Sequence, residues 1–100
     1  MEAELKAKWL AALRSGEYKQ GMGFLFNAVE GCYCCLGVLN ICAGKSAPEI
    51  DGLAIGDTDR LIYPGDGPED SDGDHVMKLM RMNDSGSSFV EIADWIEKNL

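Results

Sequence analysis

The apolar residues near the N-terminus recur with the period of an α-helix. They lie three or four positions apart, at Leu5, Trp9, Ala12 and Leu13. Residues of opposite charge lie four positions apart on the other side, as in Glu2 with Lys6, and such pairs stabilise a helix. The pattern therefore predicts a helix over residues 2–14, which Gly16 ends.

The pattern then changes to short apolar runs. Residues 22–27 and 32–34 are largely aromatic or apolar, and the short connection between them ends in Gly31. Two runs joined in this way are typical of a β-hairpin, in which Gly31 adopts a positive φ.

The helical period returns after the second run. One stripe follows the spacing i, i+3, i+4 and i+7, at Cys35, Val38, Leu39 and Cys42. It predicts a buried helix over residues 34–43 that ends at Gly44. Gly37 lies inside this helix, where glycine costs up to about 1 kcal/mol relative to alanine, and this indicates close packing against another backbone.

The periodicity predicts a further helix after residue 73. It begins at Asp74, which can act as the N-cap, and continues to Met82. Three apolar residues are expected to face inward, namely Val76, Leu79 and Met80.

A last helix is predicted at the C-terminus. Ser88 and Glu91 have the spacing of a capping box, and the stripe that follows consists of Phe89, Ile92, Ala93, Ile96 and Leu100. We expect a helix from Phe89 to about Asn99, with a turn at residues 83–86 before it.

These elements predict an α+β fold. We expect residues 1–100 to form one small domain, in which three to four helices pack with a short β-hairpin or antiparallel sheet. A chain of this length buries about 65% of the surface that it exposes when unfolded, which is enough for one core.

The sequence also indicates a compartment. Its apolar runs are too short to cross a bilayer, and the N-terminus lacks the apolar stretch of a signal peptide. The four cysteines crowd together, whereas a disulfide framework joins distant segments. We therefore expect a cytoplasmic protein with free thiols.

The distribution of charge sets one part of the chain apart from the rest, because the acidic residues are concentrated there. Residues 49–74, here called the acidic segment, contain nine carboxylates and one base, Arg60. The nine are Glu49, Asp51, Asp57, Asp59, Asp66, Glu69, Asp70, Asp72 and Asp74. Since the two flanks are each within one charge of neutrality, this segment carries the whole net charge of −8.

Motifs for catalysis and metal binding are missing. The cysteines are Cys32, Cys34, Cys35 and Cys42, and the one histidine is His75. Zinc sites use paired ligands from two separated segments, so we interpret the cysteines as small buried hydrophobic residues. A calcium loop would place Pro68 and Leu79 where oxygen ligands are needed. We expect no enzymatic activity, no metal and no cofactor.

The acidic segment has two interpretations, a solvated loop that aids solubility or a docking surface for a basic partner. Prolines and apolar residues between the acids favour the docking surface, because a uniform acidic tail lacks them. In an extended chain, Asp70, Asp72 and Asp74 lie about 6.6 Å apart, which is of the same order as the spacing of phosphate charges. Negative charge repels nucleic acid and anionic lipid, so neither is expected as a direct partner.

Three blocks of the sequence carry a specific pattern. They are Trp9–Gly16 with Tyr18–Gly21, Cys34–Leu39, and Met82–Gly86 with Phe89 and Glu91–Asp94. These blocks resemble small phage and prophage proteins, mostly of unassigned function, which share a CCLGVL core and an ND-x-G-x-x-F-x-EIAD motif near the C-terminus. Asn40 stands where such proteins commonly carry a cysteine, which argues against a cysteine metal site.

This resemblance suggests a function when it is combined with the charge. Small acidic phage proteins include anti-CRISPR inhibitors, which occupy the DNA-binding surfaces of defence complexes. We therefore expect a phage-encoded, non-enzymatic inhibitor that acts in the cytoplasm of the bacterial host. Its acidic segment would mimic DNA and block the Lys/Arg-rich, nucleic-acid-binding groove of a CRISPR–Cas effector subunit.

Two alternatives stay open. One is a binding protein for a small nucleotide signal, in which an aromatic residue stacks on the base and basic residues converge on the phosphates. The aromatic candidates are Trp9, Tyr33 and Trp95, and the basic candidates are Lys19, Lys45, Arg60 and Arg81. The other is an accessory structural protein whose acidic segment only keeps it soluble.

Overall fold

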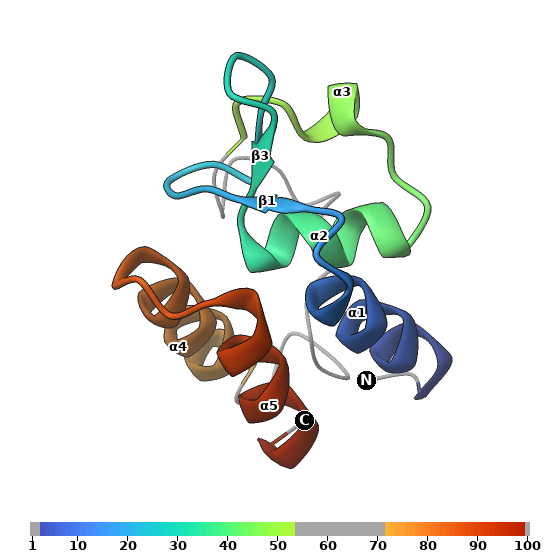
Figure 1. Cartoon of the computed structure of the whole chain (residues 1–100), viewed down its shortest axis with the longest axis vertical. Helices are drawn as coiled ribbons and strands as arrows, with labels where there is room; N and C mark the ends of the chain where they lie inside the picture. Colours follow the sequence, from blue (N-terminus) through green and yellow to red (C-terminus); the bar gives the residue numbers. More distant parts are fainter. Residues whose placement is uncertain (1–2, 54–71, 100) are drawn as a thin grey trace.

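Helices α1, α2, α4 and α5 pack together, and a small sheet lies next to α2 (Figure 1). The computed structural model describes residues 3–53 and 72–99, and of residues 72–76 the backbone alone. The elements are α1 (Ala3–Ser15), β1 (Lys19–Gln20), β2 (Phe26–Asn27), β3 (Cys32–Tyr33), α2 (Cys35–Cys42), α3 (Ala47–Ile50), α4 (Asp72–Asp84) and α5 (Phe89–Asn99). The predicted α+β class is confirmed.

Three helices lie where the hydrophobic periodicity predicts them. Helix α1 is shifted by one residue from its expected bounds and ends before Gly16, whose φ is +77°. Helix α2 ends before Gly44, whose φ is +103°. At the start of α5, the Ser88 N–H donates to Glu91 Oε1 (3.0 Å) and the Glu91 N–H donates to Ser88 Oγ (3.2 Å). This capping box gives α5 its predicted bounds.

Helix α4 is longer than its pattern predicts. It begins at Asp72, two residues before the expected N-cap at Asp74, and it includes Asn83 and Asp84, which were expected to form a turn. The turn itself comes at Ser85–Gly86, with φ +102° at Gly86. Leu79 is fully buried and Met80 is partly buried, as expected, whereas the side chain of Val76 lies outside the described residues.

The sheet is mixed, because a third strand that was not predicted pairs in parallel with the predicted antiparallel hairpin. Strands β2 and β3 form the predicted hairpin, with Phe26 opposite Tyr33, and Gly31 in its turn has φ +67°. Strand β1 pairs with β3 in parallel, with Lys19 opposite Cys32. A two-residue polar strand has no alternating pattern, so the sequence offers no signal for β1.

Helix α3 is also additional to the prediction. It has four residues and starts after Ser46, with Pro48 in its first turn. Proline is tolerated there because the first N–H groups of a helix lack partners within the helix. None of the helices in residues 3–53 and 72–99 is long and apolar enough to cross a membrane.

The core lies between α1, α2, α4 and α5. Side chains from α1 (Trp9, Leu13), α2 (Leu36, Val38, Leu39), α4 (Leu79) and α5 (Ile92, Ala93, Ile96) form one buried cluster. Trp9 is fully buried, and its Nε1 donates to the backbone carbonyl of Cys35 (2.9 Å). This bond satisfies the indole N–H inside the core and ties α1 to the first turn of α2.

Gly37 allows α2 to approach the backbone that leads into β2. A Cβ atom at this position would lie 2.7 Å from the carbonyl carbon of Leu25 and still closer to its oxygen. The same oxygen accepts a hydrogen bond from the N–H of Cys34 (3.2 Å). The close approach that Gly37 indicated is confirmed, and no side chain fits there.

Gly37→Ala is expected to destabilise the protein by roughly 1–3 kcal/mol, because α2 or Leu25 must move to make room for the methyl group. Within an exposed helix the same substitution would stabilise by up to about 1 kcal/mol, so the two effects differ in sign. Urea unfolding followed by circular dichroism measures the difference. A variant more stable than the wild type would contradict the close approach.

Candidate functional site

Two acids of the acidic segment, Glu49 and Asp51, have side chains that the structure describes, and both stabilise local structure. Glu49 Oε1 accepts hydrogen bonds from the N–H (3.0 Å) and the hydroxyl (3.1 Å) of Ser46. These bonds favour the charged form and lower the pKa of Glu49. Asp51 Oδ1 accepts the N–H of Ala28 in the hairpin turn (3.0 Å). Both side chains are exposed, yet they anchor the start of the segment.

The other acids of the segment divide into two groups. Asp57, Asp59, Asp66, Glu69 and Asp70 lie outside the described residues. Asp72 and Asp74 lie in the first turn of α4, where the backbone is helical.

The backbone geometry expected for the end of the acidic segment differs from the one observed. The backbone is helical at Asp72 and Asp74, where residues rise about 1.5 Å each, so the extended backbone expected for these two residues is wrong. Acidic residues are generally favoured in the first turn of a helix, because the helix dipole stabilises negative charge there.

A buried polar junction lies at the opposite end of α4. Asn83 is 1% exposed, and its Oδ1 accepts hydrogen bonds from Gln20 Nε2 (3.0 Å) and from the N–H of Cys35 (3.2 Å). Its Nδ2 donates to the carbonyl of Gly21 (2.7 Å). Because Cys35 offers a donor and Gly21 an acceptor, one orientation of the amide fits. Asn83 thus joins α4 to β1, to the loop after it, and to α2.

This junction also caps α2. Cys35 is the first residue of the helix, so its N–H has no partner within the helix, and the preceding Cys34 makes no side-chain cap. Asn83 supplies the missing acceptor from another helix. The sequence predicts a turn at Asn83 and does not indicate this role, because no local pattern distinguishes a buried asparagine from a turn residue.

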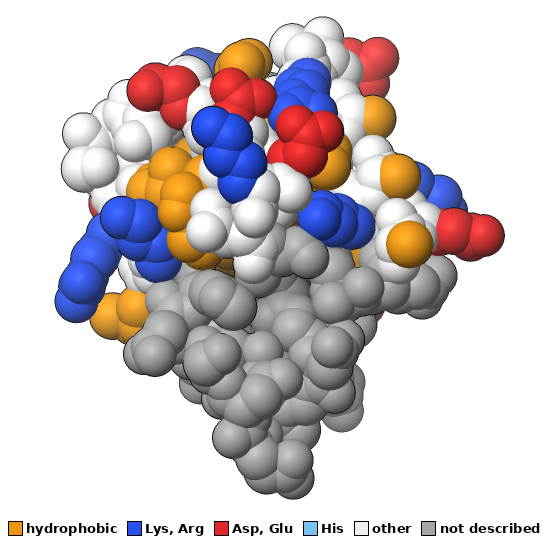
Figure 2. Space-filling view, turned by 90° about the horizontal axis from the view of Figure 1, so that it is seen from below, with side chains coloured by type: hydrophobic (Ala, Val, Ile, Leu, Met, Phe, Trp, Pro, Cys, Tyr) orange, Lys and Arg blue, Asp and Glu red, His pale blue; other side chains and the backbone are white. Residues whose placement is uncertain are grey.

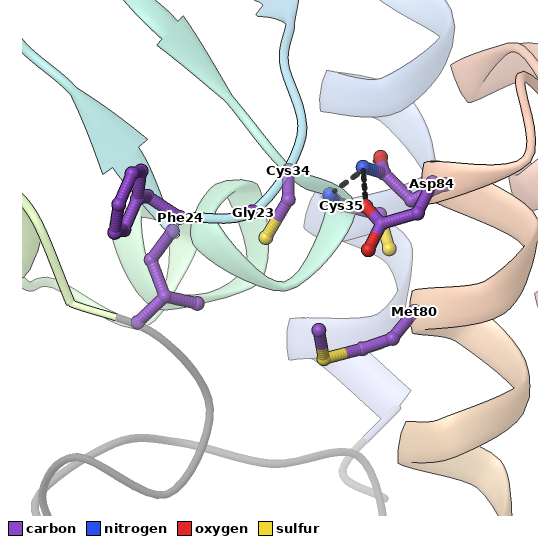
Figure 3. A pocket seen from close by; sticks show the side chains of 8 residues that line it. Gly23, Phe24, Cys34, Cys35, Met80 and Asp84 are labelled. Carbon is purple, nitrogen blue, oxygen red and sulfur yellow. Dashed lines mark hydrogen bonds between the residues drawn. The ribbon is translucent and has the colours of Figure 1, made fainter.

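A small pocket opens beside the junction (Figure 3). Its labelled lining residues are Gly23, Phe24, Cys34, Cys35, Met80 and Asp84. Met80 extends from α4 toward the loop that carries Gly23 and Phe24 (Figure 3). The lining is mainly apolar, and Asp84 is its one ionisable carboxylate.

The four cysteines are free, and Cys32, Cys34 and Cys35 are buried as the sequence predicts. Burial raises the pKa of Cys34 and, more strongly, of Cys35, so both remain protonated thiols near neutral pH. The described residues contain no group of three or more histidine, cysteine or acidic side chains placed to hold a metal ion. The side chain of His75 lies outside them.

The candidate nucleotide-stacking residues are placed differently from one another. Trp9 is buried in the core, so the expectation that it stacks on a base is wrong. Tyr33 is partly buried between Tyr18 and Phe26, with ring centroids 5.2 and 4.6 Å away, and Trp95 is partly buried against the core.

The basic candidates for phosphate binding lie on separate elements. Lys19 is in β1, Lys45 follows α2, and Arg81 is in the last turn of α4, where it lines a shallow pocket with Met77. Arg60 lies outside the described residues. No described pocket combines a stacking aromatic ring with two of these bases.

One comparison with known proteins gives a match. Residues 1–48 match the model of a domain of unknown function, DUF8296. The matched region contains α1, the three strands and α2, and it ends immediately before Glu49. No curated protein and no solved structure matches the chain significantly. The similarity to DUF8296 therefore covers one side of the fold and stops where the acidic segment begins.

The surface outside the acidic segment has mixed charge. Figure 2 shows acidic and basic side chains interspersed on the described part of one face, with apolar side chains among them. Arg14, for example, pairs with Asp94 (2.9 Å) and Glu97 (3.1 Å) and so links α1 to α5.

Asn83→Ala is expected to destabilise the protein by roughly 2–4 kcal/mol, because it leaves the N–H of Cys35 and the carbonyl of Gly21 without their partner. Asn99→Ala is the matched control, since Asn99 is exposed on α5 and bonds within its own helix. Urea unfolding of both variants measures the difference. Equal destabilisation would show that the junction does not hold the elements together.

Cys42 is expected to react first with a thiol reagent such as DTNB, because it is partly exposed while the other three cysteines are buried. Native protein at pH 8 should show one fast thiol, and protein in denaturant should show four. Cys42→Ser removes the fast phase in the native protein. Fast labelling that persists in this variant would contradict the burial of the other thiols.

Proposed function

We propose that the protein is a non-enzymatic inhibitor that uses its acidic segment to occupy the basic, nucleic-acid-binding groove of a partner protein. The proposed partner is a host defence protein, in particular a subunit of a CRISPR–Cas effector. This proposal rests on one observation above all, the concentration of the net charge of −8 within residues 49–74. A cleft lined by lysine and arginine attracts such a segment at long range.

The way in which the segment begins supports a docking role. Besides the bonds of Glu49 and Asp51, the carbonyl of Leu53 accepts the N–H of Leu25 (2.7 Å), and Leu25 is buried in the core. The segment is therefore fastened to the folded body at its start, and the chain returns to the body in α4. A tether at both ends reduces the entropy that is lost on binding.

The match to DUF8296 is consistent with different roles for the matched region and for the acidic segment that follows it. The matched region ends at Pro48, so the shared part of the fold is the part with nearly balanced charge. The acidic segment, which follows the matched region, would then determine which partner this chain binds. The resemblance to small phage proteins suggests which class of partner this is.

Catalysis by the cysteines is disfavoured by their surroundings. Reactive cysteines are exposed and have a lowered pKa, whereas burial raises the pKa of Cys34, Cys35 and Cys42. Binding alone is sufficient for the proposed inhibition.

The acidic segment is tested with two triple variants that change the net charge equally. Asp57→Asn with Asp59→Asn and Asp66→Asn removes three of the nine negative charges of the segment, and Glu4→Gln with Glu17→Gln and Glu97→Gln removes three negative charges elsewhere. Affinity capture from a bacterial lysate first identifies the partner, and fluorescence anisotropy then measures binding. The segment variant is expected to bind at least about tenfold more weakly, and the control about as tightly as wild type.

The partner's nucleic acid should also compete with this protein for binding, and raising the salt concentration should weaken the complex. Equal binding by the two triple variants, or a partner that binds DNA and this protein simultaneously, would contradict the proposal. Asp72 and Asp74 are left unchanged, because their substitution would also weaken the start of α4.

A further inference from the structure

The described part of the chain consists of two units. Residues 3–53, here called the N-terminal unit, contain α1, the sheet, α2 and α3. Residues 72–99, here called the C-terminal hairpin, contain α4 and α5. The hairpin packs on the N-terminal unit through two pairs of helices, α5 on α1 and α4 on α2 (Figure 1). The fold therefore contains one interface between two consecutive parts of the chain.

Backbone hydrogen bonds are made within each unit. The three strands, and the bridge from Phe26 to Asp51, all belong to the N-terminal unit. In residues 3–53 and 72–99, no backbone-to-backbone hydrogen bond joins one unit to the other. Within this part of the chain, the hairpin is held by its side chains, as a separate protein would be.

The centre of the interface is apolar. The hairpin contributes five side chains to the core, each at most 7% exposed, namely Leu79, Phe89, Ile92, Ala93 and Ile96. Helices α1 and α2 contribute Trp9, Leu13, Leu36, Val38 and Leu39 to the same buried cluster. Separation of the two units would expose both sets to water, and burial of such apolar area drives protein association.

Polar contacts give the interface a defined register. Asn83 of the hairpin bonds to Gln20, Gly21 and Cys35 of the N-terminal unit. On the outside, Arg14 of α1 forms ion pairs with two carboxylates of α5. An apolar centre with directed polar contacts and charges at the rim is the usual anatomy of an interface between two proteins.

The family match follows the same division of the chain. Residues 1–48, which match DUF8296, include α1 and α2 and end before α4. The similarity thus covers the helices that receive the hairpin and no part of the hairpin itself.

We propose that the face formed by α1 and α2 is a binding surface for a helical hairpin, and that the C-terminal hairpin occupies it as a separable ligand. The partner that fits is a pair of amphipathic helices with an apolar stripe and an asparagine near the end of its first helix. The hairpin of a second copy of this chain has the same chemistry. This inference does not depend on the proposed function.

The proposal is tested by cutting the full chain between its two units. A recognition site for a specific protease is inserted between Leu53 and Asp72, and the purified protein is cut, in dilute urea where the native protein resists. After dialysis into buffer, the two pieces are expected to co-elute in size-exclusion chromatography, with the circular dichroism of the uncut protein. Dilution should then separate them, because the chain no longer holds them at a high effective concentration.

Matched variants of the cut protein show which contacts hold the hairpin. Asn83→Ala should weaken the association at least about thirtyfold, which corresponds to about 2 kcal/mol. Asn99→Ala is the control and should change it less than about twofold, because Asn99 is exposed and bonds within α5. Arg14→Ala should weaken it less than about tenfold, since the ion pairs of Arg14 are at the surface. Sedimentation over a range of concentrations measures each dissociation constant.

The cut wild-type protein tests the proposal without any substitution. Pieces that separate or precipitate at every concentration after dialysis would overturn it, and so would equal association of the Asn83→Ala and Asn99→Ala proteins. A labelled hairpin that exchanges from one cut protein into another would support it, because the surface is then refilled by a hairpin from a different molecule. Each of these results leaves the proposed function to its own test with the two triple variants.

Discussion

The hydrogen bonds of the Asn83 side chain hold α2, α4 and β1 together. One amide, buried to 1% exposure, pairs with the side chain of Gln20 and with backbone groups of Gly21 and Cys35. Gln20 continues the network to the carbonyl of Ser87 (2.7 Å). An unpaired polar group is costly in the interior, so α2, α4 and β1 are stable together only in the register that satisfies all of these bonds.

Leu25, which is buried, connects the core to the start of the acidic segment. Its carbonyl accepts the N–H of Cys34 against the space left by Gly37, and its N–H donates to Leu53. One buried backbone unit therefore fixes α2, the loop that carries Phe24 and the start of the acidic segment. The start of the proposed docking segment is thus attached to the core that also holds α2.

The proposed roles of the cysteines and of the acidic residues follow from where these residues lie in the structure. Cys32, Cys34 and Cys35 are buried in the fold, and burial keeps the thiols of Cys34 and Cys35 protonated by raising their pKa. Acidic residues at the edges of the described body, such as Glu49 and Asp51, stabilise local structure, so the charge available for a partner comes mainly from the rest of the acidic segment.

The sequence by itself determined the features that depend on neighbouring residues. Helices α1, α2 and α5 follow from periodicity and from caps such as Ser88 with Glu91, and the concentration of acid is a property of composition. The tertiary structure alone decided the parallel pairing of β1, the burial of Asn83 and the exposure of Met22 and Phe24. Each of these depends on residues distant in the chain, and a pattern of nearby residues contains no information about which distant groups will be in contact.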